Sequence, residues 1–117
     1  MHYEEPASSE PSEIRSALNR GDAETAARLI VGLTLHTRDL QAAIEVCSEA
    51  SRVADEVVRG NAILGFGHLA RRFRQLDRLR VEPLILAGLK DASAYVRGQA
   101  QAAADDVHHF LGWQFDV

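Results

Sequence analysis

Residues 58–62, Val-Arg-Gly-Asn-Ala, return 38 positions later as residues 96–100, Val-Arg-Gly-Gln-Ala. The match continues at the same offset, with Asp39 falling on Asp77 and Leu69 on Val107. A period near 40 residues is typical of arrays of stacked helix pairs, because a single pair cannot bury its apolar face alone. We therefore predict an all-α fold, a short right-handed solenoid of about three helical hairpins with about six helices.

Apolar spacing and capping residues place these helices along the chain. They are residues 12–19, a stretch after Asp22 that ends before residues 36–38, a stretch opened by Asp39, and residues 56–73, 80–89 and 94–111. Pro83 is acceptable only in the first turn of its helix. Three glycines inside residues 56–73 weaken that helix, so we predict that other helices pack closely against them.

Residues 1–11 are rich in Glu, Ser and Pro and offer little to bury, which predicts a flexible N-terminal arm. Residues 12–117 then form a single domain. The N-terminus lacks the basic start and apolar core of a signal peptide, and no apolar run approaches the length of a membrane span. The single cysteine, Cys47, cannot form an internal disulfide. We expect a soluble protein of the reducing cytoplasm.

The stretch from Pro83 to Ala100 resembles a HEAT unit, with Pro83 in its first helix, Asp91 at the turn and Val96-Arg97 opening the second helix. In HEAT repeats the turn Asp and the Arg commonly form a ladder, so the resemblance implies structural roles for Asp91 and Arg97. Residues 39–73 are a looser copy, because their turn acid is displaced to Asp55 and this part of the ladder is left open. Residues 12–35 match only as a hairpin and are interpreted as an end cap.

The formal net charge of −4 argues against a nucleic-acid partner, which requires a basic face, and favours a basic protein partner. The charge is uneven, with 5 basic and 11 acidic residues in residues 1–57 against 8 basic and 6 acidic in residues 58–117. We expect no membrane partner, and a free chain that is monomeric or weakly self-associating.

Each candidate for chemistry has a structural interpretation. Asp105 and His109 lie four residues apart, but no second cluster completes a metal site. His68 has no nucleophile or carboxylate at a recognisable spacing, and Cys47 lacks a basic neighbour to lower its pKa. We expect no enzymatic activity, no cofactor and no metal.

Two groups of residues permit two interpretations. Arg71, Arg72, Arg74, Arg78 and Arg80 either complement a helix end or contact an acidic partner. Trp113 and Phe115 either cap the last hairpin or anchor a partner.

Residues 55–111, including residues 59–62, 65–71 and 104–107, resemble small bacterial HEAT-like proteins. Several of these are immunity proteins of polymorphic toxin systems, including contact-dependent growth inhibition (CDI) systems. The resemblance implies a protein that binds one cognate toxin domain, often a nuclease, and covers its active site or substrate groove. The main alternative is a generic HEAT-type scaffold or regulator unrelated to toxins. A third alternative is an enzyme, such as a repeat-type lyase or a nucleic-acid repair protein.

An acidic inhibitor suits a basic nuclease groove, because complementary charge accelerates association. The predicted partner contacts are Glu45, Glu49, Asp55, Glu56, Asp105, Asp106 and His109.

Overall fold

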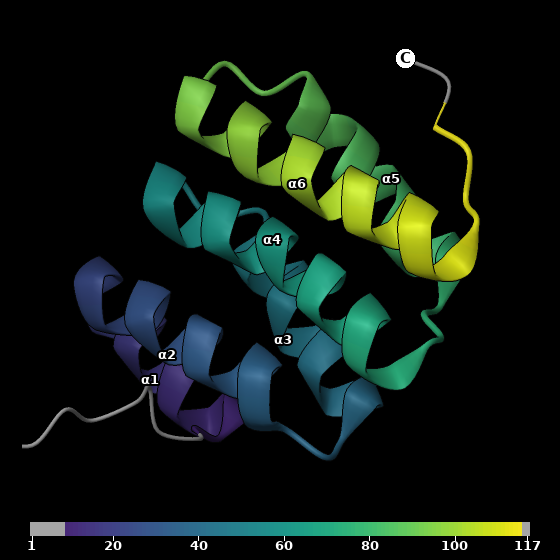
Figure 1. The fold of residues 1–117 in the computed structure, drawn as a ribbon. Coiled ribbons are helices and arrows are strands. Elements are labelled where there is room, and N and C mark those ends of the chain that lie inside the picture. Colours follow the sequence, from purple (N-terminus) through teal and green to yellow (C-terminus); the bar gives the residue numbers. More distant parts are fainter. Residues whose placement is uncertain (1–8, 116–117) are drawn as a thin grey trace, which may run out of the picture.

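The computed structural model describes residues 9–115, which form six helices and no strand. The helices are α1 (Pro11–Asn19), α2 (Ala23–His36), α3 (Leu40–Ala50), α4 (Glu56–Phe73), α5 (Arg78–Leu89) and α6 (Ala94–Leu111). Figure 1 shows α2, α4 and α6 side by side in one layer, with α1, α3 and α5 behind them. The all-α prediction is confirmed. The right-handed sense and the HEAT assignment stay predictions.

Helices α2 and α3 begin directly after the predicted caps Asp22 and Asp39, and Asp55 caps α4. Asp22, Asp39 and Asp55 each accept a hydrogen bond from a backbone N–H in the first turn of α2, α3 and α4, at 3.0 to 3.1 Å. Such caps satisfy amide groups that have no partner inside the helix. At the other end of the chain, Gly112 ends α6 with a φ of 73°, in the left-handed region that glycine adopts without strain.

Helix α5 departs from the prediction because it begins at Arg78, so Pro83 lies inside the helix and not in its first turn. Pro83 has no N–H for the carbonyl of Leu79, the residue four positions before it. Leu79 is 92% exposed, so water can solvate this carbonyl at the surface.

The N-terminal boundary also differs from the predicted Ser12. Ser9 is buried and its hydroxyl donates to the Leu29 carbonyl at 2.7 Å. The side chains and backbones of Glu10 and Glu13 form a capping box at the start of α1. Residues 9–11 of the predicted arm therefore contact the fold, and residues 1–8 lie outside the described residues.

Helix α4 is the centre of the fold and contacts α2, α3, α5 and α6. Its residues Val58, Ala62, Phe66 and Leu69, which recur at helical spacing, are fully buried, and Phe73 at its end is half-buried. Cys47 of α3 is also fully buried, and burial raises the pKa of its thiol to about 12. This thiol therefore behaves as a small apolar side chain, as the sequence indicated.

The glycines of α4 lie at close helix contacts, which confirms the packing prediction. A Cβ on Gly65 would lie 2.6 Å from Thr34 Cγ2 of α2, and a Cβ on Gly67 would lie 3.1 Å from Ala103 Cα of α6. Both glycines are buried, so a larger side chain has no room.

The 38-residue repeat is also a repeat of hydrogen bonds. Arg59 Nη1 donates to the carbonyls of residues 53–54 at 3.2 and 2.8 Å. At the same offset, Arg97 Nη1 donates to the carbonyls of residues 91–92 at 2.8 and 3.0 Å. In both hairpins the arginine therefore ties the first turns of its own helix to the preceding turn.

One rung of the predicted ladder joins the second hairpin to the third. Arg59 donates from Nε and Nη2 to the two carboxylate oxygens of Asp91, each at 2.8 Å. The Arg59 bonds lower the pKa of Asp91 to about 2. Asp55 does not take part, because its carboxylate caps α4. Counted from the caps Asp22 and Asp55, the first hairpin has Ala26 where the second has Arg59, so it supplies no further rung.

The C-terminal segment folds back on the last hairpin. Trp113 is only 7% exposed, and its carbonyl accepts a hydrogen bond from His108 Nδ1 at 2.9 Å. Phe115 is half-buried, with its ring 6.3 Å from that of Trp113. The capping interpretation of these aromatics therefore holds.

The basic residues at the end of α4 and just after it also make internal contacts. Arg72 donates to the Thr34 and Thr37 carbonyls at the end of α2, at 3.0 and 2.6 Å. Arg74 and Arg78 lie over the rings of Phe110 and Trp113, at 4.7 and 5.0 Å from the ring centres. These contacts favour helix termination and packing as the role of the cluster.

Candidate protein-binding surface

The seven predicted contact residues lie in three separate places. Glu45 and Glu49 belong to α3, in the layer of α1, α3 and α5. Asp55 and Glu56 lie at the start of α4, whereas Asp105, Asp106 and His109 lie in the last part of α6. The structure therefore does not gather them into one patch.

The two glutamates of α3 share an exposed stripe, as predicted, but both face arginines of neighbouring helices. Arg15 of α1 donates from Nε to both Glu49 oxygens at 3.0 and 3.1 Å, which lowers the pKa of Glu49. Arg80 of α5 lies 3.9 Å from Glu45. All four side chains are 41% to 54% exposed, so these surface pairs contribute little to stability and remain accessible to a partner.

The acids of α6 differ in their surroundings. Asp105 is exposed and accepts a bond from Gln101 Nε2 at 3.0 Å. Asp106 is half-buried against Gly67 of α4, so it belongs partly to the helix contact. His109 is exposed, with its ring edge-on to Phe110 at 4.6 Å. Asp105 and His109 are the more accessible of the three.

A polar bridge that was not predicted runs across the layer of α2, α4 and α6. Asn61 of α4 donates from Nδ2 to the Ala27 carbonyl of α2 at 3.2 Å. Its Oδ1 accepts bonds from the Tyr95 hydroxyl and Gln99 Nε2 of α6, at 2.5 and 3.2 Å. The available sequence signal is that Asn61 and Gln99 occupy the same polar position in the two copies of the repeat.

A groove lies beside this bridge, between the first turns of α2 and α4, with a volume of about 490 Å³. Its lining residues are Ala23, Glu24, Ala27, Arg28, Asp55, Val57 and Asn61. Val57 is 41% exposed and Tyr95 of α6 is 40% exposed, so apolar surface lies next to acidic groups here. Such a mixture of apolar and polar groups is the usual composition of a protein contact surface. Asp55 is the predicted contact residue that the structure brings to this groove.

His68 lies in the same layer, where Nδ1 shares a hydrogen bond with Thr34 Oγ1 of α2 at 3.0 Å. Burial lowers the pKa of His68, nearby Arg71 lowers it further, and Asp106 opposes them. Thr34 is fully buried and also bonds the Val31 carbonyl, so it is not presented to a substrate. His68 therefore joins α4 to α2.

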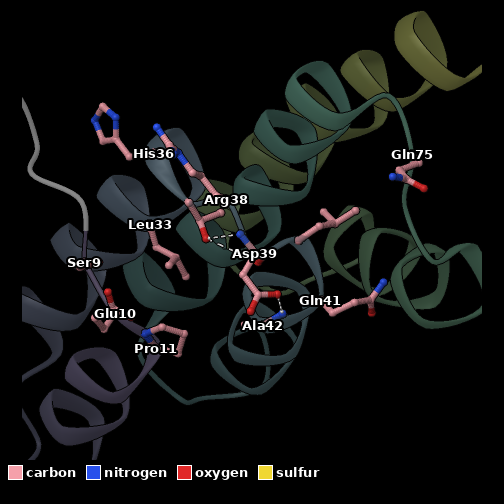
Figure 2. A pocket seen from close by; sticks show the side chains of 12 residues that line it. Ser9, Glu10, Pro11, Leu33, His36, Arg38, Asp39, Gln41, Ala42 and Gln75 are labelled. Carbon is pink, nitrogen blue, oxygen red and sulfur yellow. Dashed lines mark hydrogen bonds between the residues drawn. The ribbon is translucent and has the colours of Figure 1, made fainter.

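A pocket of about 910 Å³ lies between the start of α1, the turn after α2, and Gln75 (Figure 2). Its polar groups bond locally, since Asp39 accepts from Ala42 N and Thr37 Oγ1 accepts from Asp39 N. His36 and Gln75 lie at opposite sides of the view in Figure 2 and do not converge.

Neither a metal-ligating cluster nor a helix able to span a membrane occurs among residues 9–115. His108 bonds the Trp113 carbonyl and His109 packs on Phe110, so these two side chains serve different neighbours.

No family model and no curated protein matches the chain. Among solved structures, the chain is similar to one from the crystal structure of a CDI complex from Cupriavidus taiwanensis LMG 19424. The TM-score is 0.75, the sequence identity is 28%, and the match covers 94% of this chain and 97% of that chain. The resemblance to proteins of CDI systems, predicted from the sequence, is confirmed at this level.

Proposed function

We propose that this chain is an immunity protein that binds and neutralises a cognate toxin domain. The observation that carries the proposal is the likeness to a chain of a CDI complex, which extends over 94% of this chain and 97% of the other. Since both chains are matched almost end to end, the likeness concerns the whole fold and not one hairpin.

The surface of the chain supports a role in binding a protein. The accessible acids Glu45, Glu49, Glu56 and Asp105, together with the net charge of −4, would attract a basic toxin domain and accelerate association. The groove between α2 and α4 adds partly apolar surface that a partner can bury. Binding over the active site or substrate groove of the toxin, a nuclease in our proposal, would then block access of its substrate.

The remaining parts of the proposal concern what the chain does not do. We propose that it is not an enzyme, that it uses no cofactor, and that it meets its toxin in the cytoplasm without binding nucleic acid or membrane. The bonds of His68 and the burial of Cys47 support this part, because each is engaged in packing between helices.

Co-expression tests the function directly. The product of the gene immediately upstream is expressed alone and together with this chain, and growth is measured. The proposal predicts arrest by the upstream product alone, rescue by this chain, and co-purification of the two proteins. Arrest without rescue would contradict an immunity role and would favour a scaffold unrelated to toxins.

Charge reversal tests the electrostatic part separately. Replacing Glu45, Glu49, Asp105 and Asp106 together by Lys should slow association by at least about tenfold at low salt. A control variant that reverses Glu13 and Asp77 changes the net charge by half as much, at exposed residues outside the groove and outside the predicted contact set, and should slow association much less. An unchanged association rate in the fourfold variant would overturn the charge argument while leaving the immunity role intact.

A further inference from the structure

Arg97 is held in the same way as Arg59, but at the outer end of the array. Both arginines use Nη1 to bind the two carbonyls of the preceding turn. The Nε and Nη2 groups of Arg59 then receive the carboxylate of Asp91 from the next hairpin. The corresponding groups of Arg97 have no partner within residues 9–115, and the side chain is exposed. Arg97 therefore presents an oriented fork of two donors, which is the geometry that binds a carboxylate at two points.

Gly98, next to Arg97, is likewise the open equivalent of a covered residue on α4, Gly60. Gly60 is covered by the next hairpin, since a Cβ there would lie 2.7 Å from Tyr95 Cε2. A Cβ on Gly98 would meet nothing within 4 Å. The open site on α6 therefore has the same two parts as the filled site on α4, namely an arginine fork and a glycine against which a ring can lie.

The C-terminal segment covers a different part of this outer end. Trp113 and Phe115 share a small pocket with Leu89, Gln101, Ala104, Asp105 and His108. Those residues of α6 follow Gly98, so the cover lies along the C-terminal half of the helix. The end of the array is thus closed at one half and open at Arg97 and Gly98.

A second copy of this chain is a poor occupant on grounds of charge. The carboxylate that fills the site on α4 lies two residues before the cap Ser93, at Asp91. Two residues before Asp22, the cap of α2, stands Arg20, which is exposed. Head-to-tail stacking of two copies would therefore bring one guanidinium group against another, which is repulsive.

We propose that Arg97 and Gly98 form a docking site for the partner protein, a segment of which presents a carboxylate four residues before an aromatic ring. This is the spacing of Asp91 and Tyr95, which occupy the equivalent site on α4. The inference rests on the proposed function, because it takes the partner to be the toxin domain. Beyond the proposed function, it specifies that the toxin binds the α6 end of the array and contributes a carboxylate and an aromatic ring at Arg97 and Gly98.

Titration calorimetry with the purified upstream toxin domain, in a form with its activity abolished, tests this site. Arg97→Glu should weaken binding about 100-fold, because it removes a charged pair and places two carboxylates together. Gly98→Leu should weaken binding at least about tenfold by filling the space for the ring. Since Leu favours a helix more than Gly does, this second variant is expected to fold at least as stably as the parent chain.

Arg38→Glu is the matched control, because Arg38 is an exposed arginine in the turn after α2 and makes the same change in charge. Its affinity should stay within about threefold of the parent value. If the parent chain binds the toxin and both test variants bind equally well, the docking site is wrong while the proposed function stands. If Arg97→Glu weakens binding and Gly98→Leu does not, the site does not bind an aromatic ring beside the carboxylate, and the proposed docking site is wrong. If the parent chain itself fails to bind, the proposed function fails, and this inference fails with it.

Discussion

The α2–α4 and α4–α6 contacts join successive hairpins by different means. At α4–α6, Arg59 and Asp91 form a two-point ion pair between side chains that are only 19% and 17% exposed, and Tyr95 covers Gly60. At α2–α4, no such pair exists among the described residues, and side chains of α4 bond instead to groups of α2. Asn61 bonds a carbonyl of that helix, and His68 bonds Thr34.

The rung is missing at α2–α4 because both of its partners are missing there. The first hairpin has Ala26 in place of the arginine and the second has Val53 in place of the acid, so neither residue is left without its partner. Contacts through small residues then replace the ion pair, with Gly65 against Thr34 as the closest approach.

The largest expected effect is at that approach. Gly65→Val should lower the free energy of unfolding by about 3 kcal/mol, because its Cβ would lie 2.6 Å from the fully buried Thr34. Urea unfolding measures this change. Gly98→Val is the control, since its side chain points into open space and should have little effect. Equal losses at both positions would mean that helix propensity, and not packing against α2, decides the outcome.

Removing the rung at α4–α6 should have the next largest effect. Asp91→Asn should cost about 2 kcal/mol, because a charged hydrogen-bond pair at a largely buried site is replaced by a weaker neutral one. Asp105→Asn offers the same chemical change at an exposed site and should be close to neutral. A stability of Asp91→Asn equal to that of the parent would show that the rung positions α6 without stabilising it.

Acid should weaken the α2–α4 contact, through His68, and the α4–α6 contact, through Asp91, in separate ranges of pH. The pKa of His68 is lowered by burial, so the unfolded chain binds a proton more readily, and stability should fall as pH drops below about 6.5. The pKa of Asp91 is lowered to about 2, so its contribution is complete above about pH 4 and is lost as pH falls through about 2. Urea midpoints measured between pH 7 and pH 2 test both ranges. His68→Gln should remove only the upper step, and persistence of that step would assign it to another histidine.

The smallest expected effect is at Gly60, which the Tyr95 ring covers. Gly60→Ala should cost somewhat less than about 1 kcal/mol, because its Cβ displaces the Tyr95 ring, which is 40% exposed and can move. In a Tyr95→Ala background the same substitution should stabilise the chain, since alanine prefers a helix and the other near neighbour, Gln99 Cγ at 3.2 Å, belongs to a partly exposed side chain that can move. A cost that is unchanged in that background would show that the ring is not the obstacle.

The sequence predicted the helices well because their ends are local features. Asp22, Asp39 and Asp55 cap the helices that follow them, and Gly112 ends the last one. The resemblance to a HEAT unit also implied that Asp91 belongs to a ladder. It did not predict that Arg59 is the partner, because that pairing depends on how far one hairpin is shifted along the next.

The surface was less predictable for the same physical reason. The bridge from Asn61 to Tyr95 joins residues 34 positions apart, and no local pattern indicates which side chain lies opposite. Likewise, Glu45 and Asp105 are both acidic and exposed, but they belong to different layers of the fold. Apolar spacing identifies the buried face of each helix, whereas the relative positions of the exposed faces come from packing.

The central claim is that this chain neutralises a toxin by binding it. The most direct measurement is the activity of the purified upstream toxin domain on its substrate, with increasing amounts of this chain. The account predicts that activity falls to background once the added chain saturates the toxin, and that a stable complex is recovered from the same mixture by gel filtration. Full toxin activity at a large molar excess of a correctly folded chain, with no complex formed, would contradict it.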